Sequence, residues 1–219
     1  MVLIARLLLL LIATCIRLGS SATDPTDVAA LRSLMSQWQN TPQTWGKSDD
    51  PCSTPWEGVE CTESRVTMLK LPSMGLEGTL SSDIGQLTEL QNLDLSYNDL
   101  RGELTPNIGD LKKLSVLILT GCRFSGVIPQ ELGNLSNLDF LALNSNQFGG
   151  TIPASLGGLS HLYWLDLADN ILTGPLPIST KNSPGFDLLT SKHLHLQNNK
   201  LSGVIPEPLF SSEMRLIHL

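Results

Sequence analysis

The sequence predicts an α/β repeat solenoid, a row of short stacked coils, and two observations lead to that prediction. The first is a strict 24-residue period, in which leucine opens each unit and two further positions follow at fixed distances. The second is the composition, since 41% of the 219 residues are hydrophobic but only 5% are aromatic, as expected for a core that leucine fills. The repeated positions are Leu90, Leu114, Leu138 and Leu162; Asn98, Cys122, Asn146 and Asn170; and Gly102, Gly126, Gly150 and Gly174.

Each unit follows the order L-x-x-L-x-L-x-x-N-x-L-x-G-x-I-P, which is the leucine-rich repeat pattern. The alternation at Leu141 and Leu143 places both side chains on one face of a short strand, so the residue between them faces the other way. A single coil is too small to bury its own leucines, and neighbouring coils must therefore stack, with strands about 4.8 Å apart. The strands should have one buried and one free face.

An asparagine follows most strands, at Asn98, Asn146, Asn170 and Asn199. Its amide both donates and accepts, so stacked asparagines can satisfy the turn backbone in a tight interior. Cys122 holds this place in one coil, where a small thiol is a weak donor. Met74 holds it in the first coil and cannot donate. We therefore expect a buried asparagine ladder that begins only at the second coil.

The first residues are typical of a cleaved signal peptide, which we assign to residues 1–22. Arg6 precedes an apolar run, and Ser20 and Ala22 supply the small residues that precede a cleavage site. A membrane anchor is the alternative, but the run between Arg6 and Arg17 has ten residues, well short of the roughly 20 that span a bilayer. The prediction directs the protein into the secretory pathway.

Residues 23–64 should form a cap on the first coil. Thr26 can cap a helix that carries Asp27 in its first turn. We expect this helix to lie across the open end of the solenoid, where the first leucines would otherwise meet water. Residues 45–61 have the Pro, Gly and Asp content of a loop, and their two tryptophans should pack against the first coil. The helix residues predicted on one face are Val28, Leu31, Leu34, Met35 and Trp38.

Cleavage of the signal peptide leaves three cysteines in the mature chain. Cys52 and Cys61 are close in the sequence of an exported protein, with turn formers between them, which favours a disulfide. Cys122 should be a buried thiol.

The sequence offers no cluster of about four zinc ligands. His193 and His195 share the free face of one strand, which permits a metal, but a solvated pair is the simpler interpretation.

Three motifs occur together: the helix pattern D-x-x-A-L, the run W…DPC…W-x-G-V-x-C, and repeats that end in L-x-G-x-I-P. In this combination the mature chain resembles the ectodomain of the plant leucine-rich repeat receptor-like Ser/Thr kinases, most closely subfamily VIII-1. The resemblance implies plant-type repeats behind a helical, disulfide-containing cap, and in family members a membrane helix and a cytoplasmic kinase. The kinase motifs V-A-I-K, H-R-D and D-F-G do not occur in this sequence. We therefore expect no catalytic residues, no cofactor and no metal.

The repeats should occupy residues 65–219 in about six coils. Asn170 to Asn199 spans 29 residues instead of 24, and the five extra residues fall within residues 178–191, where Pro and Gly predict a bulge on the convex side. Loop drift explains this insertion more simply than a contact site. The last coil reaches Leu219 without the polar cap that solenoids need. We expect a truncated gene model or a fragment, with the membrane helix missing.

Three functions fit these features. The resemblance implies the ligand-binding ectodomain of a receptor kinase at the plasma membrane, with a peptide or protein ligand and a co-receptor as partners. The alternatives are a secreted apoplastic protein that inhibits pathogen cell-wall hydrolases, and a co-receptor or decoy made by truncation. A net charge of −7 argues against nucleic acid, which attracts clustered Lys and Arg.

The free faces of the strands hold the candidate partner-binding site. Val116, Ile118, Phe140 and Trp164 form an apolar patch that the repeat itself does not require, edged by Tyr163, Asp139 and Asp166. We expect a partner on this concave sheet, although Phe140 and Trp164 could simply pack on each other across strands.

A separate modification site is predicted at Asn134. Asn134, Leu135 and Ser136 form the only N-x-S/T sequon whose neighbours allow glycosylation, and the surrounding turn should face water. The sequence therefore predicts a glycan on Asn134.

Overall fold

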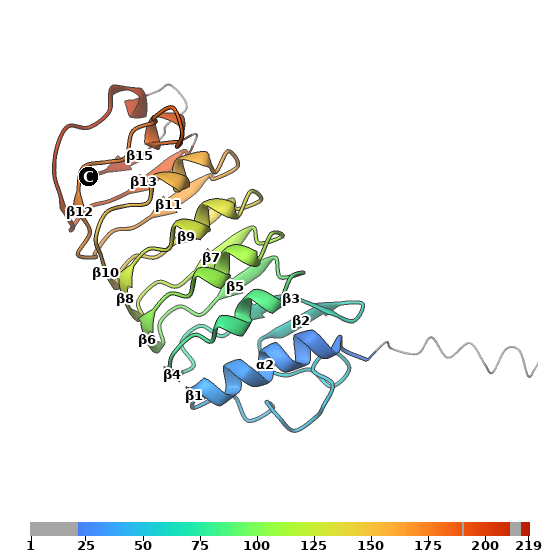
Figure 1. The fold of residues 1–219 in the computed structure, drawn as a ribbon. Coiled ribbons are helices and arrows are strands. Elements are labelled where there is room, and N and C mark those ends of the chain that lie inside the picture. Colours follow the sequence, from blue (N-terminus) through green and yellow to red (C-terminus); the bar gives the residue numbers. More distant parts are fainter. Residues whose placement is uncertain (1–21, 190, 211–215) are drawn as a thin grey trace, which may run out of the picture.

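The computed structural model describes residues 22–189, 191–210 and 216–219 and confirms the leucine-rich repeat solenoid (Figure 1). The coils stack in a single row, with strands along one flank and short helices along another. The signal peptide predicted for residues 1–22 lies outside the described residues, apart from Ala22.

One strand of each coil enters an eight-stranded sheet. The repeat strands are parallel and in step, so that Leu93 pairs with Leu117 and Leu117 with Leu141. These leucines point into the core and the residues on either side of them point outward. We call the outward side, which is the predicted concave surface, the sheet face. In spatial order the strands are β2 (Val59–Thr62), β3 (Arg65–Lys70), β5 (Asn92–Asp94), β7 (Val116–Ile118), β9 (Phe140–Ala142), β11 (Trp164–Asp166), β13 (His193–His195) and β15 (Leu216–His218).

A second set of short strands, which was not predicted from the sequence, lines an adjacent flank. The repeat strands of this set pair in parallel with the equivalent strand of the next coil, and β1 of the cap pairs antiparallel with β4, so the set depends on stacking and not on any local alternation. One sheet contains β1 (Trp38–Gln39), β4 (Glu77–Gly78), β6 (Asp99–Glu103), β8 (Arg123–Val127) and β10 (Gln147–Gly149), and a separate pair contains β12 (Thr173–Gly174) and β14 (Lys200–Leu201).

Each repeat coil closes through a short 3₁₀ helix on the convex flank. The glycine of the repeat's L-G-x-L ending has its role here, because a Cβ on Gly109 would lie 2.5 Å from the Glu131 carbonyl oxygen of the next coil. Glycine therefore permits the close stacking of the coils. The helices are η1 (Ser82–Gln86), η2 (Pro106–Asp110), η3 (Gln130–Asn134), η4 (Ala154–Gly158), η5 (Phe186–Leu188) and η6 (Glu207–Phe210).

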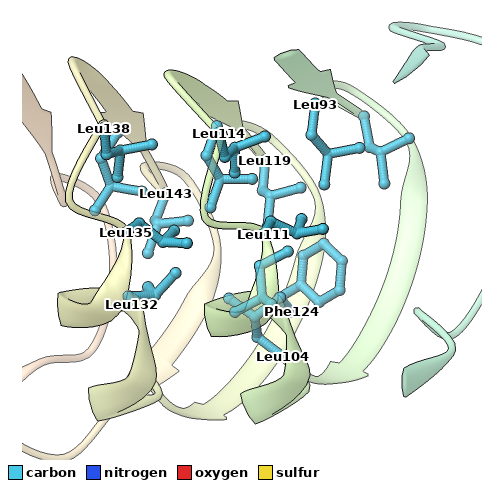
Figure 2. Close-up of a cluster of buried hydrophobic side chains, with 14 of the residues drawn as sticks. Leu93, Leu104, Leu111, Leu114, Leu119, Phe124, Leu132, Leu135, Leu138 and Leu143 are labelled. Carbon is cyan, nitrogen blue, oxygen red and sulfur yellow. The ribbon is translucent and has the colours of Figure 1, made fainter. Parts of the chain in front are cut away.

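The core between strands and helices is a continuous column of leucine. Figure 2 shows how Leu111, Leu114 and Leu119 of one coil face Leu132, Leu135 and Leu138 of the next, and all six are fully buried. Each such side chain contributes about 1.5 to 3 kcal/mol when it leaves water, and only the stack provides that burial.

The predicted asparagine ladder is present and begins with Asn98. Asn146 shows the pattern: its Nδ2 donates to the carbonyls of Leu119, Leu143 and Asn144, and its Oδ1 accepts the N–H of Phe124 at 3.0 Å. Cys122 takes one place in the ladder, where its buried thiol donates to the Leu95 carbonyl.

The cap helix is α2 (Pro25–Gln37), and its N-cap differs from the prediction. Asp24, not Thr26, is the cap, because the Asp24 carboxylate accepts the Thr26 N–H at 2.8 Å and Pro25 occupies the first helical turn. The helix packs beside η1, while β2 adds to the edge of the sheet at β3. The cap therefore substitutes for a coil at the end of the row (Figure 1).

Two features join the parts of the cap. Trp38, Trp45 and Trp56 lie in contact, with ring centroids 5.8 Å and 5.1 Å apart, so a third tryptophan joins the predicted pair. The predicted disulfide links Cys52 to Cys61.

The insertion lies on the helical flank, as expected for a convex bulge. It ends in η5, which packs between η4 and η6. A bridge between Thr180 and Ser183 closes the tip of the loop. The insertion therefore extends the convex surface and does not enter the sheet face.

Candidate ligand-binding site

The strand register brings the predicted site residues together in two columns on the sheet face. The first column joins Val116, Phe140, Trp164 and His193. The second joins Asp94, Ile118, Ala142, Asp166 and His195. Five of the six predicted site residues therefore occupy adjacent strands, and Tyr163 lies directly before β11 at the edge of the patch.

The aromatic rings of the first column form a stack. The Phe140 and Trp164 centroids are 5.5 Å apart with nearly parallel planes, so the cross-strand packing alternative is also realised. Val116, Ile118, Phe140, Trp164 and Asp166 nevertheless remain half-exposed, and Tyr163 keeps 45% of its surface open. A partner could therefore still bury a substantial apolar area here.

Histidines continue this stack toward the last coil, and here the expectation of a solvated pair is wrong. His195 is only 7% exposed, because its ring packs on Trp164 at 4.8 Å and its Nδ1 lies 3.1 Å from His218 Nδ1. His193 also contacts Trp164, and its Nε2 lies 3.2 Å from the Tyr163 hydroxyl. The sequence alone does not indicate the contact between His195 and His218, because His218 belongs to the next coil.

Burial changes the titration of this region. It lowers the pKa of His195, which disfavours the imidazolium, and it raises the pKa of Asp166, which disfavours the carboxylate. Protonation of His195 therefore costs folding free energy as the pH falls through the ordinary histidine range.

A groove of about 320 Å³ lies beside the ring stack on the sheet face. Ile118 and Ala142 belong to its floor column, and the rings of Phe140 and Trp164 form one wall. Asp94 and Asp166 stand at the two ends of the floor column. The groove is lined by Asp94, Ser96, Tyr97, Ile118, Thr120, Phe140, Ala142, Asn144, Trp164 and Asp166.

Sequence reasoning missed one wall of the groove, formed by Ser96, Tyr97, Thr120 and Asn144. Ser96, Thr120 and Asn144 recur at the 24-residue period and Tyr97 holds the next position, so the repeat columns after the strands carry the signal that could have identified them.

In the described ranges no group of three or more His, Cys, Asp and Glu side chains could hold a metal ion. None of the helices in that part of the chain has the length and apolar character needed to cross a membrane.

The predicted glycosylation site remains a prediction, and its position suits a glycan. Asn134 is exposed at the end of η3, on the helical flank. Expression in plant cells should give a chain that loses mass on glycosidase treatment, and Asn134→Gln should remove that loss. An unchanged mass in the wild-type chain would contradict the prediction.

Comparisons with known proteins agree with this architecture. The leucine rich repeat N-terminal domain model matches residues 24–62, and the leucine rich repeat model matches 89–111, 113–135, 137–159 and 191–212. A probable leucine-rich repeat receptor-like protein kinase of Arabidopsis thaliana is 58% identical over 201 residues, which cover 90% of this chain and 21% of the relative. The chain thus spans about a fifth of that relative's length.

Two solved structures from Arabidopsis show the same fold. The ectodomain of the receptor kinase SOBIR1 matches with a TM-score of 0.68 and 30% identity, over 83% of this chain and 98% of that one. The receptor kinase HAESA, solved with the peptide hormone IDA and the co-receptor SERK1, matches with a TM-score of 0.74 and 31% identity, over 85% of this chain and 32% of that one. The chain therefore belongs to the leucine-rich repeat proteins, in the form that plant receptor kinases carry as their ectodomain.

Proposed function

We propose that this chain is the extracellular ligand-binding domain of a plant cell-surface receptor-like kinase, in which a membrane helix and a kinase follow the repeats. The similarity to a receptor-like kinase over 90% of the chain supports this role. The ligand is a peptide or protein, and a co-receptor is a second partner, by analogy with the HAESA complex.

The half-exposed patch on the sheet face is the observation that carries this proposal. Leucine-rich repeats need apolar side chains on the inner face of a strand, whereas the outer face is free to be polar. Here Val116, Ile118, Phe140 and Trp164 occupy outward positions on three adjacent strands, edged by Tyr163 and Asp166. Aromatic and aliphatic side chains gathered within a polar rim are typical of interface hot spots.

Replacing Phe140 by serine should weaken peptide binding by about tenfold or more, because a hot-spot side chain is removed. The probe is a set of peptides selected from a random linear display library on the immobilised chain, with affinities measured by calorimetry. Loss of the stacked ring pair costs about 0.5 to 1.5 kcal/mol beyond the lost burial, and Phe140 is already half-exposed, so the variant should remain folded. Trp164 contacts three other rings and is a less suitable target for this reason.

Val127→Ser is the matched control. Val127 is 62% exposed and lies on β8, outside the eight-stranded sheet. The Val127→Ser variant should bind the selected peptides with unchanged affinity. Selected peptides that bind Phe140→Ser as tightly as the wild-type chain would contradict binding at the patch.

Reading the transcript beyond the codon for Leu219 separates the receptor role from the alternatives. A membrane helix followed by V-A-I-K, H-R-D and D-F-G motifs is the expected result. A stop codon after a cysteine-paired C-terminal cap would instead favour a secreted inhibitor.

A further inference from the structure

The groove beside the ring stack is bounded by two carboxylates with an apolar floor between them. In the register of the sheet, Asp94 on β5 and Asp166 on β11 are separated by Ile118 on β7 and Ala142 on β9. The two aspartates are three strand spacings apart, which is roughly 14 Å.

The two carboxylates have little compensation within the groove. Its lining residues include neither Lys nor Arg. Asp166 Oδ1 accepts the Ala168 N–H at 3.0 Å, and Asp94 Oδ1 accepts from the Ser96 N–H and hydroxyl. The remaining oxygen of each carboxylate is therefore the one that a cationic ligand group would meet.

The neighbours of the two aspartates within their column differ. Asp94 has a cationic register partner, Lys70, which it shares with Glu60, since Lys70 Nζ lies 3.9 Å from Glu60 Oε1. His195 is the register partner of Asp166, and its burial favours the neutral ring. Asp166 should therefore be the stronger of the two cation sites.

Tyr97 is the groove residue with the most unusual backbone. Its φ of 56° lies in the left-handed region, and its side chain is 64% exposed. A bulky residue is strained in this region. The ring lies against Gly121, where an added Cβ would be only 2.7 Å away. Other coils place small or short polar residues at this position, namely Ser73, Gly121, Ser145, Asp169 and Asn198. Folding alone does not explain an exposed, strained tyrosine, whereas a role as a contact in the groove does.

We propose that the groove binds an extended peptide along the solenoid axis, with one basic side chain at Asp166 and a second, four residues away, at Asp94. This inference rests on the proposed function and specifies its ligand. An extended chain advances about 3.3 to 3.4 Å per residue, so four residues match the separation of roughly 14 Å. The residues between the two cations lie over Ile118 and Ala142 and should be small or apolar. The net charge of −7 adds long-range attraction for such a ligand.

Selection from the random peptide library on the wild-type chain tests the proposal. The expected result is enrichment of Lys or Arg at two positions four residues apart. Asp166→Asn should weaken the selected peptides by on the order of tenfold, and Asp94→Asn by a smaller factor, since each variant leaves a ligand cation without its counter-charge. Asp110→Asn removes the same charge from an exposed site on η2, on the helical flank and outside the groove, and should have little effect.

Tyr97→Asn provides a second, independent measurement. Asparagine tolerates the left-handed backbone, as Asn198 shows in the same position of another coil. This variant should raise the melting temperature while it weakens the selected peptides several-fold. A merely structural tyrosine would lose stability and leave affinity unchanged.

The outcomes separate the two proposals. Peptides that depend on Phe140 but show no basic enrichment, or that tolerate Asp166→Asn, would overturn the cationic ligand while ligand binding at the patch stands. Enrichment of basic residues at another spacing would overturn the placement across Asp94 and Asp166. Selected peptides whose affinity is unchanged by the replacement of Phe140, Asp166 or Asp94 would overturn both proposals.

Discussion

Replacing Asp27 by alanine should lower the free energy of unfolding of the cap by about 3 to 5 kcal/mol, because it leaves the Arg65 cation without its counter-charge and a buried N–H without its acceptor. The Asp27 carboxylate is fully buried and accepts from Arg65 Nε at 3.0 Å, Arg65 Nη2 at 2.9 Å and the Val66 N–H at 2.8 Å. Arg65 also donates to Thr88 of the first coil. This pair therefore joins the helix, the sheet and the repeats.

Urea unfolding followed by tryptophan fluorescence measures the effect, because three of the four tryptophans lie in the cap: Trp38, Trp45 and Trp56. Asp83→Ala is the control, since Asp83 is an exposed carboxylate on the neighbouring η1 and should change stability by less than about 0.5 kcal/mol. Adding Arg65→Met to Asp27→Ala should recover part of the loss, because the unpaired cation is also removed. Equal unfolding midpoints for Asp27→Ala and Asp83→Ala would contradict this account.

Replacing Asn146 by leucine should cost about 3 kcal/mol of stability. The substitution leaves three carbonyl oxygens without the amide that bonds them and the Phe124 N–H without its acceptor. An unsatisfied buried polar group costs roughly 1 to 3 kcal/mol, and relaxation of the backbone recovers part of the total. Thermal unfolding followed by circular dichroism measures the loss.

The chain offers two matched comparisons for the ladder. Asn137→Ala removes a single exposed hydrogen bond to the Lys112 carbonyl and should cost less than about 1 kcal/mol. Cys122→Asn introduces the amide where the thiol now stands, and it should stabilise the chain by about 1 kcal/mol through one restored ladder contact. A destabilised Cys122→Asn variant that remains folded would show that the ladder position has no room for the larger side chain.

Some features could be predicted because each depends on a local pattern that repeats. The strands follow from the alternation at positions such as Leu141 and Leu143, since a side chain's face is set by parity along the strand. The ladder follows from the asparagine's donors and acceptor, and Met74 correctly marked where it could not begin. The disulfide followed from the short spacing of Cys52 and Cys61 in an exported chain.

Other features depend on which coils become neighbours, and no local pattern reports that. Asp27 and Arg65 are 38 residues apart. Asp27 does not belong to the apolar face predicted for the cap helix, so the sequence does not indicate that it is buried. The second sheet forms only when coils stack, and His195 is buried only when His218 arrives from the next coil.

By itself the sequence determined the repeat, its core leucines, the ladder, the cap's disulfide and the outward patch around Phe140, because each depends on periodicity or on short-range chemistry. Only the tertiary structure decided that Asp24 caps the helix and that Asp27 is paired with Arg65. It alone also decided that a groove with Tyr97 and two carboxylates borders the patch. The physical reason is that burial, ion pairing and concavity are properties of surfaces brought together by stacking, and they do not exist in an isolated coil.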